Sequence, residues 1–96
     1  MKNNQQISRD EVFDGVLIVL SSILDGKEAK IVPKNNITWD TDIYDDLGID
    51  SLESLDFLSG LEERFKVNPD QYEANDKRKV SEIVDYILKL ANEKPA

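Results

Sequence analysis

The sequence predicts an all-α fold, a small bundle of three main helices plus one short helix, with a long ordered loop between the first two main helices. The chain has 96 residues, which is enough for one hydrophobic core and leaves little room for a deep catalytic cleft. Apolar residues recur at helical spacing in three segments, and no segment reads convincingly as a strand. We therefore expect a single domain over residues 1–96, with frayed tails at about 1–7 and 93–96.

The first predicted helix begins after Ser8 and ends near Gly26. Ser8 is followed three residues later by Glu11, which is the pattern of a capping box. Phe13 and Leu17 widen the apolar stripe, so this helix is expected to bury a broad face. The stripe itself consists of Val12, Val16, Val19, Leu20, Ile23 and Leu24.

The segment 26–50 shows no sustained period and is rich in turn-forming residues. Loops of this length are uncommon in small domains and are usually functional. Its many apolar residues predict that it packs onto the helices. They are Ile31, Val32, Ile37, Trp39, Ile43, Tyr44, Leu47 and Ile49.

Asp50 is the candidate N-cap of the second main helix, with Glu53 three residues on. We expect its buried side to hold Leu52, Leu55, Leu58, Leu61 and Phe65. Gly60, in the interior of this helix, suggests either close packing or a tolerated surface glycine.

Two further helices are expected toward the C-terminus. Pro69 and Asp70 suit the start of a single helical turn over residues 71–75. A basic cluster, Lys77, Arg78 and Lys79, then precedes the last helix. Its apolar positions are spaced by three and four, at Val80, Ile83, Val84, Ile87, Leu88 and Ala91.

The chain contains neither cysteine nor histidine. This excludes disulfides, thiolate metal ligands, Ser-His and Cys-His nucleophile pairs and nearly every zinc site, and we predict no metal site. No run of about 18 apolar residues could span a bilayer, and the N-terminus lacks the apolar middle of a signal peptide. We expect a cytoplasmic protein without membrane insertion.

The formal net charge of -8 is concentrated in one part of the chain, because residues 35–63 hold nine carboxylates and no Lys or Arg. Such a field repels nucleic acid and anionic lipid and attracts basic protein surfaces. A solvated acidic face is the simpler interpretation. The nine residues are Asp40, Asp42, Asp45, Asp46, Asp50, Glu53, Asp56, Glu62 and Glu63.

Ser51 stands within this acidic segment and raises the question of its chemistry. A hydrolase nucleophile elbow needs Gly-x-Ser-x-Gly and a base, but Glu53 replaces the second glycine and the chain has no histidine. The run "DTDIYDDLGIDS" begins like a calcium loop, but it lacks the glycine at position six and the Glu at position twelve. Weak divalent-ion binding, a simple helix cap, and a modified serine at a helix N-terminus remain open.

The run Asp46-Leu47-Gly48-Ile49-Asp50-Ser51-Leu52 closely resembles the Asp-x-Gly-x-Asp-Ser-Leu signature of acyl carrier proteins. The likeness continues through "ESLDFLSGLEERF" and "KVSEIVDYILKL", is good from about Asp40 to Leu90, and is poor over residues 26–36. The resemblance implies that Ser51, flanked by Asp50 and Leu52, accepts 4'-phosphopantetheine from coenzyme A through a separate phosphopantetheinyl transferase. The chain would then be a non-catalytic carrier of acyl thioesters.

The resemblance also implies partners, namely the transferase and acyl-processing enzymes that carry basic surface patches. We expect a monomer that meets them through the acidic residues around Ser51. Glu53 and Asp56 are expected to matter most, with contributions from Asp45, Asp46, Glu62 and Glu63. An acyl chain could lie among Leu55, Leu58, Leu61 and Ile83, which we expect to be core residues in any case.

Three departures from the family pattern are visible: Ser59 stands where an apolar residue is usual, residues 26–36 are long, and Trp39 is unusual. They favour a carrier with a restricted partner set, for polyketide or specialised lipid synthesis, over the general fatty-acid carrier. Two alternatives remain: an aminoacyl or peptidyl carrier, and an unmodified acidic helical interaction module.

Overall fold

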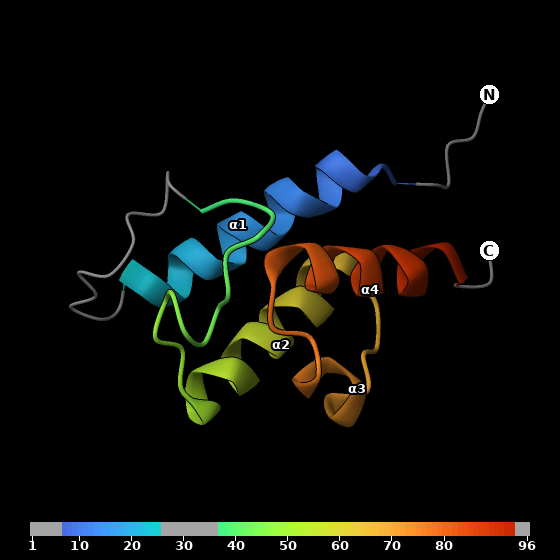
Figure 1. Cartoon of the computed structure of the whole chain (residues 1–96). Helices are drawn as coiled ribbons and strands as arrows, with labels where there is room; N and C mark the ends of the chain where they lie inside the picture. Colours follow the sequence, from blue (N-terminus) through green and yellow to red (C-terminus); the bar gives the residue numbers. More distant parts are fainter. Residues whose placement is uncertain (1–6, 26–36, 94–96) are drawn as a thin grey trace.

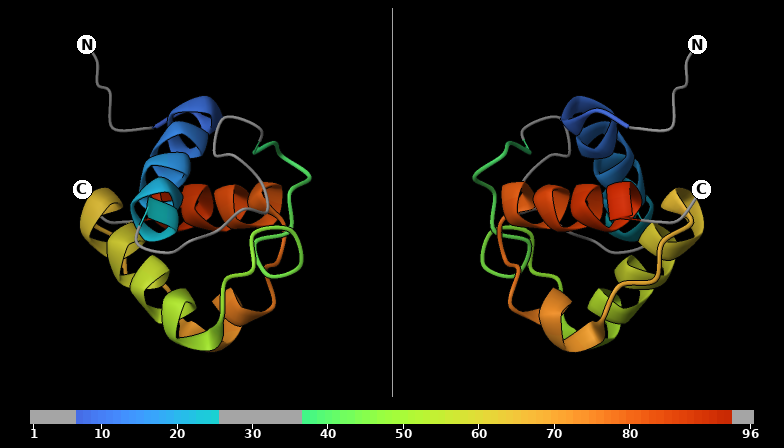
Figure 2. Two further views of the ribbon diagram at one scale, coloured as in Figure 1. Left: turned by 90° about the vertical axis from the view of Figure 1, so that its left-hand side faces the viewer. Right: turned by 90° about the vertical axis from the view of Figure 1, so that its right-hand side faces the viewer.

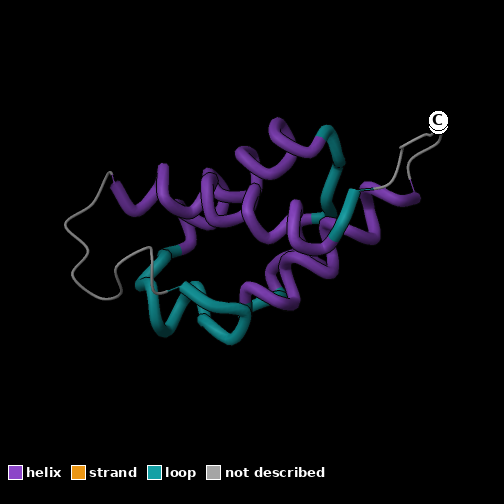
Figure 3. Tube along the Cα trace, turned by 90° about the horizontal axis from the view of Figure 1, so that it is seen from above, coloured by secondary structure: helices purple, strands orange, loops and turns teal. Residues whose placement is uncertain are grey.

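The computed structural model describes residues 7–25 and 37–93 of the chain. These residues form four helices, α1 (Arg9–Asp25), α2 (Ser51–Phe65), α3 (Gln71–Asn75) and α4 (Val80–Glu93), shown in Figure 1. The described ranges hold no strand, and their one isolated bridge pairs Asp42 with Lys79; Figure 3 shows only helix and loop. The all-α fold predicted from the sequence is confirmed.

Each of the first three helices begins at a side-chain cap that the sequence predicted. Ser8 and Glu11 form a reciprocal pair before α1, with distances of 3.1 and 2.9 Å. Asp50 and Glu53 form the same capping box at α2, with distances of 2.8 and 3.0 Å. Asp70 accepts hydrogen bonds from the first backbone N–H groups of α3. These bonds satisfy donors that the helix itself cannot.

Helix α1 packs against both α2 and α4 more extensively than these two helices pack against each other. The views in Figure 2 show α2 and α4 lying on the same side of it, with α3 joining their ends. No helix in the described ranges is long and apolar enough to cross a membrane. The core is formed by Val12, Val16, Leu20, Leu24, Ile37, Ile43, Leu47, Ile49, Phe57, Leu61, Val67, Val80, Ile83, Val84 and Ile87.

Residues 37–50, the described part of the connection between α1 and α2, pack onto the helices, as the sequence predicted. Ile37, Ile43, Leu47 and Ile49 are buried. Its backbone is joined to the start of α4 by hydrogen bonds such as Ile43 N–H to the Arg78 carbonyl, 2.9 Å. The predicted contacts of Ile31 and Val32 lie outside the described residues.

Trp39 fixes this connection to α1. Its ring stacks on Phe13 with centroids 4.2 Å apart, and the Arg9 guanidinium lies 4.5 Å from the Trp39 ring centroid. Arg9 is in turn paired with Asp85 of α4 at 2.7 Å. The Trp39 ring therefore contacts Arg9, whose ion pair with Asp85 also links α1 to α4.

The predicted buried side of α2 is wrong at Leu52 and Leu55, which are 74% and 43% exposed. Phe57 and Leu61 are buried instead, and Leu58 and Phe65 are half-buried. A helix completes a turn in 3.6 residues, so apolar residues spaced strictly by three drift around it. Leu52 and Leu61 are two and a half turns apart and therefore lie on opposite sides.

The described residues include one residue of each predicted tail. Ile7 packs against the core, and Glu93 is the last residue of α4. The remainder of the predicted tails, residues 1–6 and 94–96, lies outside the described residues.

Two glycines allow α1 and α2 to approach closely. A Cβ added to Gly60 would lie 2.6 Å from Cγ1 of Val19, and one added to Gly15 would lie 2.3 Å from the tip of the Phe65 ring. Both distances are far inside van der Waals contact. Gly60 is therefore a packing residue, which was one of the two possibilities left open by the sequence.

We predict that Gly60→Ala lowers the free energy of unfolding by about 1–2 kcal/mol, because overpacking costs more than the helix propensity of alanine returns. Chemical denaturation measures the change. Ser59→Ala, at the neighbouring exposed position, is the control and should be neutral or slightly stabilising. Adding Val19→Ala to Gly60→Ala should cost less than the sum of the two single changes; simple additivity would contradict the proposed contact.

Candidate functional site

Ser51 is the first residue of α2, and its side chain is exposed. In the described part of the chain its hydroxyl makes no hydrogen bond, although its backbone carbonyl accepts one from the Ser54 hydroxyl at 2.8 Å. The capping box of Asp50 and Glu53 fixes the backbone on which Ser51 sits. The hydroxyl is thus presented to solvent from a rigid position, at the helix end where the dipole favours a negative group.

Buried side chains and backbone hydrogen bonds fix the turn before Ser51. Leu47 and Ile49 are buried on either side of Gly48, whose φ of 71° lies in the left-handed region that suits glycine. The Gly48 N–H donates to the Tyr44 carbonyl at 3.1 Å, and Ile49 N–H donates to the Ile43 carbonyl at 3.1 Å. This anchored turn leaves Asp50 and Ser51 outside.

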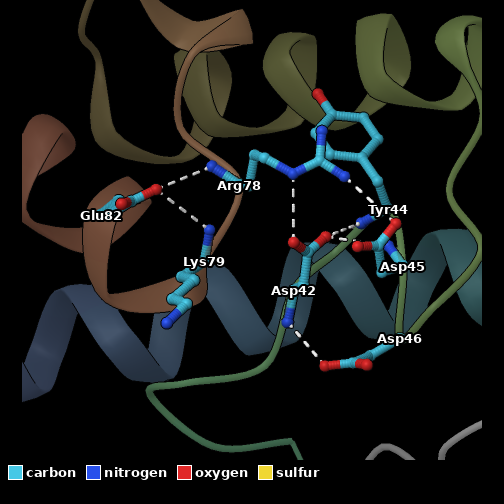
Figure 4. Close-up of polar contacts among 7 residues, drawn as sticks. All are labelled: Asp42, Tyr44, Asp45, Asp46, Arg78, Lys79 and Glu82. Carbon is cyan, nitrogen blue, oxygen red and sulfur yellow. Dashed lines mark hydrogen bonds and ion pairs between the residues drawn. The ribbon is translucent and has the colours of Figure 1, made fainter.

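Asp42 organises the acidic loop that precedes this turn, as Figure 4 shows. Its Oδ1 accepts hydrogen bonds from the N–H groups of Tyr44 and Asp45, both at 2.8 Å. Its Oδ2 lies 3.1 Å from Nε of Arg78, whose guanidinium also reaches Asp45 at 3.2 Å. Asp46 accepts from the Asp42 N–H at 2.9 Å. These carboxylates accept hydrogen bonds from backbone N–H groups and from Arg78.

Arg78 completes the cluster from the segment before α4. It lies 4.9 Å from the centroid of the Tyr44 ring, and its N–H donates to Glu82 at 2.9 Å. Hydrogen bonds from the N–H groups of Arg78 and Lys79 lower the pKa of Glu82. Burial alone would raise the pKa of Asp42, but the N–H groups of Asp45 and Tyr44 together with Arg78 outweigh it and lower that pKa.

The six predicted partner-facing carboxylates are distributed over several surfaces. Glu53 and Asp56 line a groove against α1, and Asp45 and Asp46 belong to the loop cluster just described. Glu62 and Glu63 are exposed near the end of α2. Leu52 and Leu55 add exposed apolar surface to the helix that begins at Ser51.

A separate cavity lies among α2, α3 and α4. Its volume is about 20 Å³, close to the minimum that holds one water molecule. Leu58, Leu61 and Ile83, three of the four residues among which we expected that an acyl chain could lie, line it, whereas Leu55 does not. The other lining residues are Ile43, Tyr44, Ser54, Phe57, Ala74, Asn75, Lys77, Tyr86 and Ile87. An acyl chain could enter only if these side chains moved apart.

Comparison with known proteins gives this geometry its context. Residues 26–87 match the family model described as a phosphopantetheine attachment site. The chain is 35% identical over 83 residues to an acyl carrier protein of Borreliella burgdorferi (strain ZS7), covering 86% of this chain and 96% of that one. The chain belongs to the acyl carrier protein family.

Other members of the family are similar over most of this chain. An acyl carrier protein of Thermotoga maritima is 33% identical over 82 residues, which are 85% of this chain and 94% of that one. A mitochondrial acyl carrier protein of Saccharomyces cerevisiae is 33% identical over 81 residues, or 84% of this chain. The chain spans 63% of the yeast relative's length.

The covalent cofactor implied by family membership is 4'-phosphopantetheine, and members are carriers rather than catalysts. The environment of Ser51 fits that group: the hydroxyl is exposed, and the N-terminus of a 15-residue helix favours a phosphate beside it. When bound, the arm supplies a thiol, which the chain itself lacks.

The sequence predicted the capping residues Asp50 and Glu53 and singled out Ser51 as a candidate, but it did not indicate Arg78 as a partner of the loop. Arg78 was noted only as one of three adjacent basic residues. Its contacts with Asp42 and Asp45 span more than 30 positions, with sequence separations of 36 and 33. The excess of acid over base in the loop was the one signal that could have suggested a distant cation.

We predict that Asp42→Asn lowers the free energy of unfolding at pH 7. The difference in unfolding free energy between this variant and the wild type should become smaller as the pH falls. The pKa of Asp42 is lowered from 3.8, so the charged form stabilises the fold above that value, and this contribution is lost as the pH falls from about 5 to 2. Urea unfolding across this range measures the difference.

The matched control is Asp40→Asn, which removes an exposed carboxylate from the same loop. Its free energy of unfolding should stay close to that of the wild type at every pH. If the difference in unfolding free energy between Asp42→Asn and the wild type stays constant down to pH 2, the role of Asp42 does not depend on its charge.

Proposed function

We propose that Ser51 carries 4'-phosphopantetheine on its hydroxyl oxygen and that the chain carries acyl intermediates as thioesters on this arm. The observation that supports this most directly is the exposed Ser51 hydroxyl at the start of α2, in a chain that matches a phosphopantetheine attachment model. Asp50 holds the helix start through the capping box. Leu52, beside Ser51 and exposed, is the neighbouring surface that the transferase and the arm would contact.

In this proposal the chain supplies position and recognition, and other proteins supply catalysis. A phosphopantetheinyl transferase attaches the arm from coenzyme A, and acyl-processing enzymes load and use it. Residues 1–96 act as one carrier domain, monomeric and cytoplasmic. No nucleic acid is expected to bind, because the chain has a net charge of -8.

Recognition is assigned to Glu53, Asp56, Asp45, Asp46, Glu62 and Glu63. Exposed carboxylates attract basic partner surfaces through pairs that are screened and quickly reversible, which favours rapid exchange among enzymes over tight binding. The Asp45 carboxylate is exposed and lies 3.2 Å from the Arg78 guanidinium. Ser59 is exposed on α2, so this part of the proposed surface is polar, in keeping with a restricted set of partners in polyketide or specialised lipid synthesis rather than with the general fatty-acid carrier.

The attachment site is tested by intact mass after incubation with coenzyme A and a broad-specificity transferase. We predict that the wild type gains one phosphopantetheine group and that Ser51→Ala gains none. Ser59→Ala removes another exposed hydroxyl from α2 and should be modified at a rate within about twofold of the wild type. A wild type without mass gain would instead support an unmodified interaction module.

Changing the charge of α2 tests the proposed role of its carboxylates in partner recognition. Glu53→Gln with Asp56→Lys should lower kcat/KM for modification by about tenfold at low salt and by less at high salt. Glutamine at position 53 retains an oxygen for the capping box, so α2 should still form. The control pair, Glu93→Gln with Asp76→Lys, changes the net charge equally on exposed residues elsewhere. Equal losses in both pairs would contradict a localised recognition surface.

A further inference from the structure

The cavity among α2, α3 and α4 differs in charge from the rest of the molecule. Most of its lining is apolar, with contributions from Ile43, Phe57 and Leu58. Among the described residues that line it, Lys77 is the one that carries a formal charge, and none is a carboxylate. This contrasts with the whole chain, which has 20 acidic and 12 basic residues. The cavity is therefore a small region of positive charge inside an acidic protein.

Contacts of both the backbone and the side chain hold Lys77 at the cavity. Its N–H donates to the Ala74 carbonyl at 3.0 Å, at the end of α3, and its Nζ lies 5.6 Å from the centroid of the Tyr86 ring. Tyr86 is buried, and its hydroxyl accepts a hydrogen bond from the Asp70 N–H at 2.8 Å. In the part of the chain that the structure describes, the half-buried Lys77 makes no ion pair. Its ammonium can therefore accept an anionic partner.

Lys77 also lines an open groove on the outer side of α3 and α4, and carboxylates are present there. Lys89 lines the same groove. The four carboxylates of the groove are exposed, and they belong to Glu73, Asp76, Glu82 and Asp85. Water and dissolved ions screen charges at exposed positions, whereas partly buried charges are screened much less. An anion inside the cavity is therefore affected more by Lys77 than by the outer carboxylates.

The cavity begins one helical turn from the attachment serine. Ser54, which lines it, stands three residues after Ser51, a rise of about 4.5 Å along α2. An arm on Ser51 therefore starts close to the cavity. Because the cavity volume is only about 20 Å³, the lining side chains must move apart to admit an acyl chain, and they lose packing contacts when they do. A cargo that forms an ion pair inside offsets this cost better than a cargo that does not.

We propose that Lys77 makes this chain selective for acyl groups that end in a carboxylate, the half-thioesters of dicarboxylic acids. The methylene part of such a group lies against the apolar lining, and its carboxylate pairs with the Lys77 ammonium through a charge-assisted hydrogen bond. A simple fatty acyl group brings no partner for this ammonium and removes water from it, which costs free energy. The inference rests on the proposed attachment of the arm at Ser51 and adds the class of cargo.

The test compares two cargoes of equal chain length, adipyl and hexanoyl, which differ by the terminal carboxylate. A broad-specificity transferase attaches each one from its coenzyme A thioester, and intact mass confirms the loading. The Tm of the adipyl-loaded wild type should exceed that of the hexanoyl-loaded wild type by about 2–4 °C. In Lys77→Met, which keeps a similar side-chain length without the charge, this difference should disappear or reverse, because adipyl then only adds to the net charge of -8.

Two control variants separate Lys77 from net charge. Lys89→Met removes the same charge from the outer groove, outside the cavity lining, and should retain most of the Tm difference between the two cargoes. Lys77→Arg keeps the charge and should retain it as well. Equal Tm values for the two loaded forms of the wild type, or equal losses in Lys77→Met and Lys89→Met, would overturn the proposal. If circular dichroism shows that Lys77→Met does not fold, Lys77→Gln supplies the same comparison.

Backbone amide NMR shifts locate the carboxylate. Between the adipyl-loaded and hexanoyl-loaded forms of the wild type, the shifts should differ most at residues 74–77 and at Tyr86. Differences confined to the residues beside Ser51 would overturn the proposal, because the carboxylate would then lie outside the cavity. A chain that gains no mass with either thioester would contradict the proposed attachment at Ser51 itself, whereas normal loading without a Tm difference would overturn only the role of Lys77.

Discussion

The burial of the connection that precedes α2 is the constraint on which the rest of the structure depends. Ile37, Ile43, Leu47 and Ile49 enter the core, where they contribute the hydrophobic surface that a short chain otherwise lacks. Their burial also fixes where α2 begins. A serine on a loose loop would be equally accessible, but it would not have a defined position relative to the acidic residues and grooves that surround it.

Carboxylates in the acidic segment perform two different physical tasks. Asp42, Asp46 and Asp50 accept hydrogen bonds from nearby backbone N–H groups, and Asp42 also pairs with Arg78. These contacts replace the regular hydrogen bonding that the loop does not have. Asp56, Glu62 and Glu63 are exposed on α2 and contribute to the field seen by an approaching protein. Some carboxylates of the acidic segment thus order the loop, and others give the surface of α2 its negative charge.

Local signals in the sequence predicted much of the fold. The caps at Ser8, Asp50 and Asp70 were predicted because a helix cap depends only on residues a few positions apart. The buried face of α2 was not, because Leu52 and Leu55 continue an apolar spacing while pointing away from the core, and Phe57 breaks that spacing. The fit of Gly60 to Val19 and of Arg78 to Asp42 depends on how distant segments meet, which no local pattern specifies. For the site, the motif predicted Ser51 as the attachment residue, whereas the groove against α1 followed only from the packed helices.

The position of Trp39 gives the chain an internal optical reporter. It is the single tryptophan of the sequence, and its ring is stacked on Phe13 beneath Arg9. Its emission therefore senses the seating of the connection on α1 rather than the helix content of the bundle as a whole. Comparing tryptophan emission with helical dichroism during unfolding would show whether the connection leaves α1 before the helices separate, without any attached dye.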